Sequence, residues 1–298
     1  MIKYSINLVK IFFIFCIFYY LYINNHLDLS FLQKFYNNYL LNLTLLILIF
    51  SSIFIGSVRW FLLLKSIKSN ITFYQVFKIY YISSLFNNIL FGTLGGDLVR
   101  MHYISRYSWT NKLKSNLTII TDRIMGLIGL TLLGLLSLSI ILINYNMTII
   151  VISSIIIFII IIILFYKILK FFKKKKYVSL FLIYVQINKI VLMICIFISF
   201  SIFLIVHYVT FLICNYIFLF NIDLNIVFFS NFISTLVSAL PLTPGGLGLG
   251  EASFAFINQN YFNIYLNNLA NVIIYLRIID FIVSLPSLYF FIVYKNQK

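Results

Sequence analysis

Charged residues are scarce in this sequence, and acidic residues are the scarcest of them. Only 9% of the 298 residues are charged, and Asp and Glu together number 6 against 22 Lys and Arg. Soluble domains have roughly a quarter charged and about 45–50% apolar residues, whereas 63% of this chain is hydrophobic. The composition excludes an ordinary soluble globular protein, a disordered chain and a soluble nucleic-acid-binding protein. It indicates an integral membrane protein.

Cysteine, proline and glycine are also few, with 3, 3 and 11 residues. Cys16, Cys195 and Cys214 all lie inside apolar runs, which argues against a disulfide framework or a zinc site. The histidines are isolated, and the glycines near position 245 lack the spacing of a nucleotide loop. We therefore expect no metal and no cofactor. The few places where Gly and Pro gather then become informative, because they interrupt apolar runs.

Apolar runs of about 20 residues recur along the chain, which is the length of a membrane-spanning helix, whereas a barrel strand has about 10. Hydropathy predicts six uninterrupted spans, at residues 8–24, 39–58, 117–143, 147–166, 188–220 and 267–294. Two longer apolar stretches, 72–106 and 224–262, are each broken near the middle. We expect one all-α polytopic membrane domain over residues 1–298, with about six full transmembrane helices plus two broken, re-entrant helical hairpins.

The basic residues predict the orientation, because cytoplasmic loops carry an excess of Lys and Arg. With both termini in the cytoplasm, Lys34 is the only basic residue in an outer loop. Each broken stretch must then cross the membrane an even number of times. Either the two stretches dip in from opposite faces and return, or each crosses twice, which gives about ten crossings in all. Two hairpins that enter from opposite faces are typical of an inverted-repeat transporter.

The breaks themselves are rich in Gly and Pro. Gly92-Thr93-Leu94-Gly95-Gly96 interrupts the first stretch, and Pro241-Leu242-Thr243-Pro244-Gly245-Gly246 interrupts the second. Irregular backbone at membrane depth is tolerated only where protein or a water-filled cavity satisfies its polar groups. The breaks therefore predict a shared polar cavity, and the alternative is a pair of plain turns at the membrane surface.

Four of the six acidic residues lie at these breaks or inside predicted spans, where a charge costs at least about 2.5–3.5 kcal/mol. Asp97 and Arg100 are spaced i, i+3 and can pair on one helical face, as can Arg277 and Asp280. Such pairs either mark a functional polar cavity or only lock helices together.

Two of these four acidic residues, Asp122 and Glu251, need partners from elsewhere in the chain. Asp122 and Arg123 are sequence neighbours whose side chains point apart, so each requires its own partner. Glu251 has no basic residue nearby in the sequence. It would be satisfied if Arg100, Arg123 or Arg277 reached it across the cavity.

A half-helix begins after each break, near Asp97 and near Leu247. Its amino terminus presents free N–H groups and the positive end of the helix dipole. With arginines nearby, such a cavity favours an anion such as a phosphate. The acidic residues would offset excess positive charge and could also exchange protons or bind a substrate ammonium. An anionic headgroup with apolar tails fits these features, which suits a phospholipid or a polyprenyl-phosphate glycolipid.

The motifs resemble the signatures of the membrane region of lysylphosphatidylglycerol synthases, also called the flippase-like family. Gly95-Gly96-Asp97-Leu98-Val99-Arg100, followed by Asp122-Arg123 and a Gly-Leu, resembles the first signature. The segment from Leu240 to Glu251 resembles the second, Pro-x-x-Pro-Gly-Gly-x-Gly-x-x-Glu, and Arg277-Ile278-Ile279-Asp280 resembles a final polar pair. Asp122 stands where many members have Glu.

The resemblance implies a protein of the cytoplasmic membrane associated with lipid translocation. In fused members a separate soluble domain performs aminoacyl transfer, and because the chain ends at Lys298 we expect no such activity. The expected substrate is a membrane lipid or a lipid-linked glycan, with a lipid-modifying enzyme as partner and no nucleic acid. The expected cavity residues are Gly95, Gly96, Asp97, Arg100, Asp122, Arg123, Pro244, Gly245, Gly246, Glu251, Arg277 and Asp280. The alternative is a membrane enzyme or accessory subunit in polyprenyl-phosphate glycolipid or aminoacyl-phospholipid metabolism.

Overall fold

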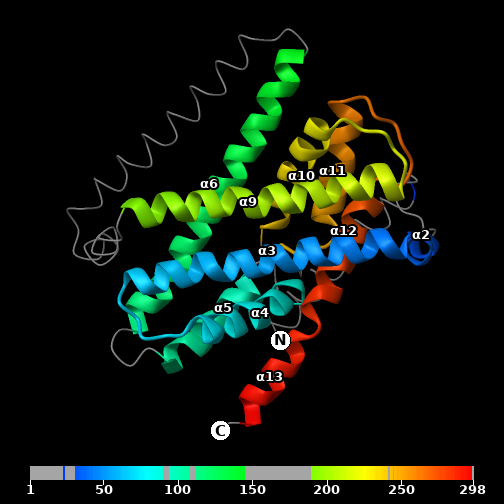
Figure 1. Ribbon diagram of the computed structural model, residues 1–298. Helices are drawn as coiled ribbons and strands as arrows, with labels where there is room; N and C mark the ends of the chain where they lie inside the picture. The colour runs from blue at the N-terminus through cyan, green and yellow to red at the C-terminus, as the bar shows by residue number, and fades with distance from the viewer. Residues whose placement is uncertain are drawn as a thin grey trace, which may run out of the picture.

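The computed structural model describes residues 23, 31–89, 94–107, 112–144, 189–240, 242–243 and 245–296, and its regular elements there are all helical (Figure 1). The all-α class is thereby confirmed. The elements are α2 (Phe31–Asn37), α3 (Tyr39–Ser66), α4 (Phe73–Ile89), α5 (Leu94–Tyr107), α6 (Lys112–Asn144), α9 (Lys189–Leu212), the π-helical turn η2 (Ile213–Ile217), α10 (Leu224–Ser238), α11 (Leu249–Asn260), α12 (Leu269–Ser284) and α13 (Ser287–Asn296). The predicted span at 147–166, and all of the span at 8–24 except Ile23, lie outside the described residues.

Three helices are long and apolar enough to cross a membrane: Tyr39–Ser66, Ser115–Ile143 and Ile190–Ile217. Figure 1 shows α3 and α9 lying side by side, with α6 passing across them, and the three helices contact one another. Gly129 permits the close approach of α6 to α9, because a Cβ there would lie 2.6 Å from the Cβ of Ser199. Small residues at such crossings are typical of membrane helices, whose association depends on close packing.

Each broken stretch forms a pair of short helices packed against each other, α4 on α5 and α10 on α11. The four arms have 17, 14, 15 and 12 residues. At 1.5 Å per residue they reach only about 18–26 Å, less than the ~30 Å hydrocarbon core. In the view of Figure 1 the α4–α5 pair lies below α3 and the α10–α11 pair lies above α9. These two pairs are called the first and the second hairpin below.

The last predicted span, 267–294, is not one continuous helix. It is divided into α12 and α13, which are bent by 40° at Leu285-Pro286. Proline has no backbone N–H to donate within the helix, and its ring clashes with the carbonyl one turn earlier. The hydropathy of this segment hides the break because the residues on both sides of Pro286 remain apolar.

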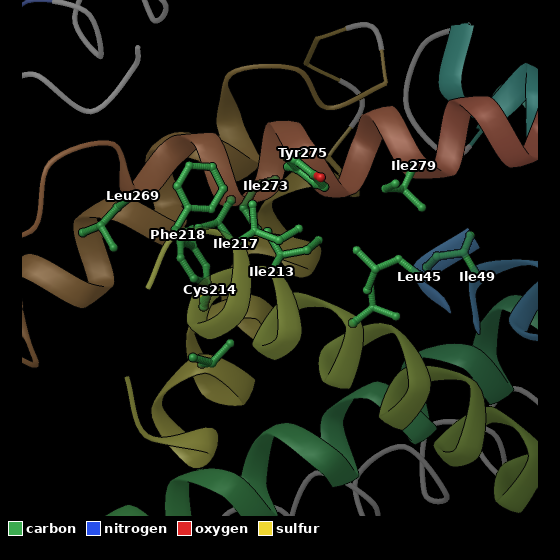
Figure 2. Packing of buried hydrophobic residues seen from close by; sticks show 14 of the residues in the cluster. Leu45, Ile49, Ile213, Cys214, Ile217, Phe218, Leu269, Ile273, Tyr275 and Ile279 are labelled. Atoms are coloured by element: carbon green, nitrogen blue, oxygen red, sulfur yellow. The ribbon is translucent and has the colours of Figure 1, made fainter. Parts of the chain in front are cut away.

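The main buried cluster packs α12 against α3 and against the end of α9 (Figure 2). Figure 2 shows Tyr275 and Ile279 of α12 lying close to Ile213 at the α9–η2 junction and to Leu45 of α3. The Tyr275 hydroxyl also donates a hydrogen bond to Asn42 Oδ1 at 2.5 Å. Lipid tails are as apolar as these side chains, so tight packing and this hydrogen bond stabilise the contact. The cluster fixes the position of α12 on the bundle.

Candidate functional site

The first group of charged side chains joins three helices through one carboxylate. Asp122 of α6 accepts from Arg59 Nε of α3 at 2.6 Å and from Arg100 Nη1 of α5 at 2.9 Å. All three side chains are at most 8% exposed. Hydroxyl groups complete the set, since Arg59 donates to Ser199 Oγ at 2.8 Å and Arg100 donates to Ser83 Oγ at 3.1 Å. Asp122 thus has a partner on each oxygen.

A second ion pair connects the first hairpin to α6. Arg123 donates to Asp97 through both Nε and Nη2, with a closest distance of 2.9 Å. This pair is more open, with the Arg123 side chain 33% exposed. The prediction that Asp122 and Arg123 each take a separate partner is confirmed. The structure differs from the predicted pairing of Asp97 with Arg100, because both residues of α5 face α6 and each meets one of its two charges.

Arg59, Asp97, Arg100, Asp122 and Arg123 are called the N-terminal network below. Its centre is covered by aromatic rings. The Arg100 guanidinium lies 4.4 Å from the centroid of the Tyr80 ring and 5.4 Å from that of Trp60. Such cation–π contacts stabilise a charge that is removed from water. The network therefore joins α3, α5 and α6 through hydrogen-bonded and covered charges.

The second break carries its own ion pair. Arg277 Nε of α12 lies 2.7 Å from Glu251 Oε1 of α11, so an arginine does reach Glu251, as the sequence required. The same guanidinium donates to the carbonyl of Gly245, to that of Gly246 at 2.8 Å, and to Ser238 Oγ at 3.4 Å. Both glycines have positive φ, 58° and 70°, a conformation that side chains with a Cβ rarely adopt. Gly245, Gly246, Glu251 and Arg277 are called the C-terminal site below.

Asp280 does not share this arginine as the i, i+3 spacing predicts. Within the described residues no ion pair of 4.0 Å or less includes Asp280. Arg277 turns instead toward the irregular backbone of the second break, where carbonyl oxygens accept its N–H groups. These carbonyls belong to the irregular backbone before α11, and the Gly246 carbonyl accepts the backbone N–H of Gly250 at 3.4 Å as well as the guanidinium.

A cavity of about 280 Å³ opens beside the C-terminal site. It is lined by Asn88, Leu247, Glu251, Ile274, Arg277, Ile278 and Phe281. Two charged side chains thus face a space with mostly apolar walls. Of the predicted cavity residues, Glu251 and Arg277 line this cavity. Gly245 and Gly246 contribute through their carbonyl groups, which accept hydrogen bonds from Arg277.

The remaining predicted residues lie elsewhere. Asp97, Arg100, Asp122 and Arg123 belong to the N-terminal network, and Gly95 and Gly96 are buried in the first turn of α5. Asp280 is partly buried on α12, and Pro244 lies outside the described residues. Their participation in substrate binding stays a prediction.

The two breaks lie next to each other through consecutive residues of α4. Asn87 Oδ1 accepts the backbone N–H of Gly96 at 3.0 Å, beside the first break. The carbonyl oxygen of Asn88 lies so close to Gly245 that a Cβ there would be 3.0 Å away. Asn88 Nδ2 also donates to Ser284 Oγ on α12 at 3.4 Å. The tip of the first hairpin therefore contributes Asn88 to the wall of the cavity beside the second break.

Sequence reasoning did not identify Arg59 as a member of the network. The signal was present, because the apolar run continues past Arg59 through Trp60 to Leu64 and places the arginine inside a helix. It also missed Asn87 and Asn88, an amide pair directly before the first break. Among the described residues, no group of three or more His, Cys, Asp or Glu comes together as a metal site.

Comparison with protein families gives one finding. The family model described as the lysylphosphatidylglycerol synthase TM region matches residues 8–287. Neither the curated proteins nor the solved structures give a match. The match extends over both hairpins and all the charged residues described above.

Proposed function

The chain belongs to the family of the lysylphosphatidylglycerol synthase TM region, and we propose that it is a lipid flippase that moves an anionic phospholipid or a lipid-linked headgroup across the cytoplasmic membrane. Membership of this family, together with several long apolar helices, identifies a multi-pass membrane protein with a lipid-related function. The observation that carries the flippase proposal is the cavity at the second break, with a partly exposed arginine in an apolar wall.

The chemistry of the cavity suits an amphiphile with a phosphate. The guanidinium of Arg277 is always charged and has planar donors that match phosphate oxygens. It is 25% exposed and lines the cavity, so it can be reached by a ligand without unfolding the site. Ile274, Ile278 and Phe281 supply an apolar wall along α12 for the adjoining part of a lipid. A water-soluble anion would gain nothing from that wall.

The architecture supports transport through an inverted repeat, which we propose together with six full spans, two re-entrant hairpins and cytoplasmic termini. In each half a long helix is followed by a hairpin and then by another helix of the bundle. In each half an acidic residue in the first turn of the hairpin's second arm pairs with an arginine on the next helix, Asp97 with Arg123 and Glu251 with Arg277. Adjacent hairpin tips and arms too short to span support re-entrance.

The proposal is tested by reconstituting the full chain in liposomes that contain acyl-chain-labelled phospholipids. Transfer between leaflets is measured by quenching the outer label with a membrane-impermeant reductant. We expect Arg277→Ala to slow transfer about tenfold or more, since a charge-assisted hydrogen bond to phosphate is lost. Lys65→Ala, which removes an exposed cation at the end of α3, is the matched control and should keep the wild-type rate. Wild-type liposomes that transfer no lipid faster than protein-free liposomes would contradict the proposal.

A further inference from the structure

Glu251 is a buried carboxylate at the wall of the cavity, and it is only partly satisfied by donors. Oε2 accepts a long hydrogen bond from Arg277 Nη2 at 3.5 Å, whereas Oε1 accepts none from the described part of the chain. Oε1 lies 2.7 Å from Arg277 Nε, so the attraction between opposite charges stabilises the ionised carboxylate. The first turn of α11 adds the positive end of a helix dipole. The ionised state of Glu251 therefore depends on these two contributions, and Arg277 supplies the only full charge.

The charged groups around Glu251 are one base and one further acid. α11 packs against α10 and α12, and α4 contributes the uncharged Asn88 to the cavity wall. Glu251 is the only titratable residue of α11, and α10 has none. α12 carries Tyr275, Arg277 and Asp280; the Tyr275 hydroxyl is bonded to α3, and Asp280 lies one turn beyond Arg277. α10, α11 and α12 thus hold no second cation that could replace Arg277 beside Glu251.

An anionic lipid that binds in the cavity competes with Glu251 for Arg277. When the phosphate pairs with the guanidinium, the carboxylate is left buried without its cation, which is strongly disfavoured. A buried carboxyl group in that position takes up a proton and becomes neutral. Its new O–H can donate to a carbonyl that Arg277 has left, such as that of Gly246. The cavity of about 280 Å³ is large enough to admit water as the source of that proton.

We propose that Glu251 is the proton carrier of the transport cycle, so that each anionic lipid crosses the membrane together with one proton. This inference rests on the proposed function and adds its energy coupling. A proton passes from water on one side to a Glu251 carboxylate oxygen when the lipid phosphate pairs with Arg277. When the lipid leaves, Arg277 returns to Glu251 and the proton is released to water on the other side. One negative and one positive charge move together, so the complete step transfers no net charge.

The first test applies a pH difference of about one unit, acidic outside, to the liposome assay with acyl-chain-labelled phosphatidylglycerol. If one proton accompanies each lipid, the ratio of label in the inner leaflet to label in the outer leaflet should approach the proton ratio, which is about tenfold. The impermeant reductant measures that ratio directly. Protein-free liposomes under the same pH difference are the control and should stay near a ratio of about one.

A membrane voltage separates proton coupling from transfer of the lipid anion alone. A voltage of about 60 mV would redistribute a lone anion about tenfold, whereas the coupled step carries no net charge and should not respond. The voltage is imposed with valinomycin and a potassium gradient at equal pH. A sodium gradient in place of the pH difference tests the other common coupling ion. Accumulation driven by voltage or by sodium would overturn the assignment of a proton.

Variants test whether Glu251 is the carrier. Glu251→Gln keeps the shape of the side chain but cannot take up the proton, so its label should ignore the pH difference and follow the voltage instead. Glu251→Asp keeps a carboxylate and should regain the tenfold ratio, at a lower rate. Asp223→Asn, which changes an exposed carboxylate at the start of α10, is the matched control and should keep the wild-type ratio. A Glu251→Gln protein that still follows the pH difference would overturn the role of Glu251.

The wild-type protein decides between the two proposals even if Glu251→Gln does not fold. Wild-type protein that transfers the lipid but leaves both leaflets equally labelled under the pH difference would overturn the inference and leave the flippase proposal intact. Wild-type protein that transfers no lipid at all contradicts the flippase proposal itself.

Discussion

The N-terminal network and the C-terminal site use the same arrangement to different ends. In both, an acidic residue near the start of a hairpin arm meets an arginine of the following helix. The network contains three arginines and two aspartates, and Asp122 is bonded on both oxygens. The C-terminal site has a single arginine, one carboxylate oxygen without a hydrogen bond, and a cavity beside it.

The comparison teaches how to separate a structural ion pair from a binding site inside a membrane protein. A charge whose hydrogen bonds are all made by the protein has little left to offer a ligand. A charge that is held by backbone carbonyls and faces a cavity can exchange those partners for a ligand. By this criterion the N-terminal network joins helices, and we propose that the C-terminal site receives substrate.

The largest effect is expected where the network is broken at its shared acid. Asp122→Asn leaves Arg59 and Arg100 buried without a carboxylate, and removing one member of a buried ion pair typically costs about 3–5 kcal/mol. We expect a large drop in the free energy of unfolding, measured by denaturant titration in detergent. The matched control is Asp223→Asn, which changes an exposed aspartate before α10 and should leave the unfolding curve unchanged. An equal stability of both variants would show that the network does not hold the helices.

A smaller loss of stability, of about 1–2 kcal/mol, is expected for Arg277→Lys. The lysine ammonium keeps the charge but lacks the planar, forked donors with which the guanidinium contacts Glu251 and both glycine carbonyls at once. The tip of the second hairpin should loosen, so a cysteine placed at buried Thr243 should react faster with a maleimide in the Lys variant than in the wild type. Unchanged labelling would show that Arg277 does not fix the tip.

The more exposed ion pair of the network, Asp97 with Arg123, should contribute less to the free energy of unfolding than the buried contacts of Asp122. Asp97→Asn removes the charge opposite Arg123, whose side chain is one-third exposed, and water then solvates the arginine. We expect a loss of about 1 kcal/mol or less in the free energy of unfolding. The same titration used for Asp122→Asn provides the measurement. A loss as large as that of Asp122→Asn would mean that both ion pairs are equally important for stability.

The smallest effect on stability is expected for Asn88→Ala, which removes one long hydrogen bond to Ser284. Hydrogen bonds between membrane helices average about 0.6 kcal/mol, so the unfolding curve should hardly move. Transfer of lipid should still fall, because Asn88 lines the cavity. Normal transfer by this variant would show that the first hairpin takes no part in the substrate site through Asn88.

The sequence allowed the helices of the bundle to be located, because apolar runs of span length have few other interpretations in such a composition. It also showed which charges lacked local partners, Asp122, Arg123 and Glu251, because neighbouring side chains on a helix point apart. It could not show that Asp97 takes Arg123 instead of Arg100. That choice depends on how α5 faces α6, and an i, i+3 spacing carries no information about contacts between helices.

Two further features depended on tertiary contacts or on a single residue. Arg59 is recognisable in the sequence as an arginine inside an apolar run that continues to Leu64, but the run does not show that its partner is Asp122 of α6. Pro286 bends the last span without lowering its hydropathy. The sequence predicted a polar cavity shared by the two breaks, and that shared cavity stays a prediction. The cavity beside the second break is lined mainly by residues of α12, with Asn88 from α4, and these contacts are set only when the hairpins pack.

The adjacency of Asn87 and Asn88 has a thermodynamic consequence. One residue bonds beside the first break, and the next touches the second, with a single peptide bond between them. We expect a ligand that displaces Asn88 to change the free energy of the contact at Gly96 as well. Linkage is reciprocal, so an event at the first hairpin would then alter the affinity of the cavity by the same factor. A double-mutant cycle between Asn87 and Arg277, read out as lipid affinity, measures that coupling directly.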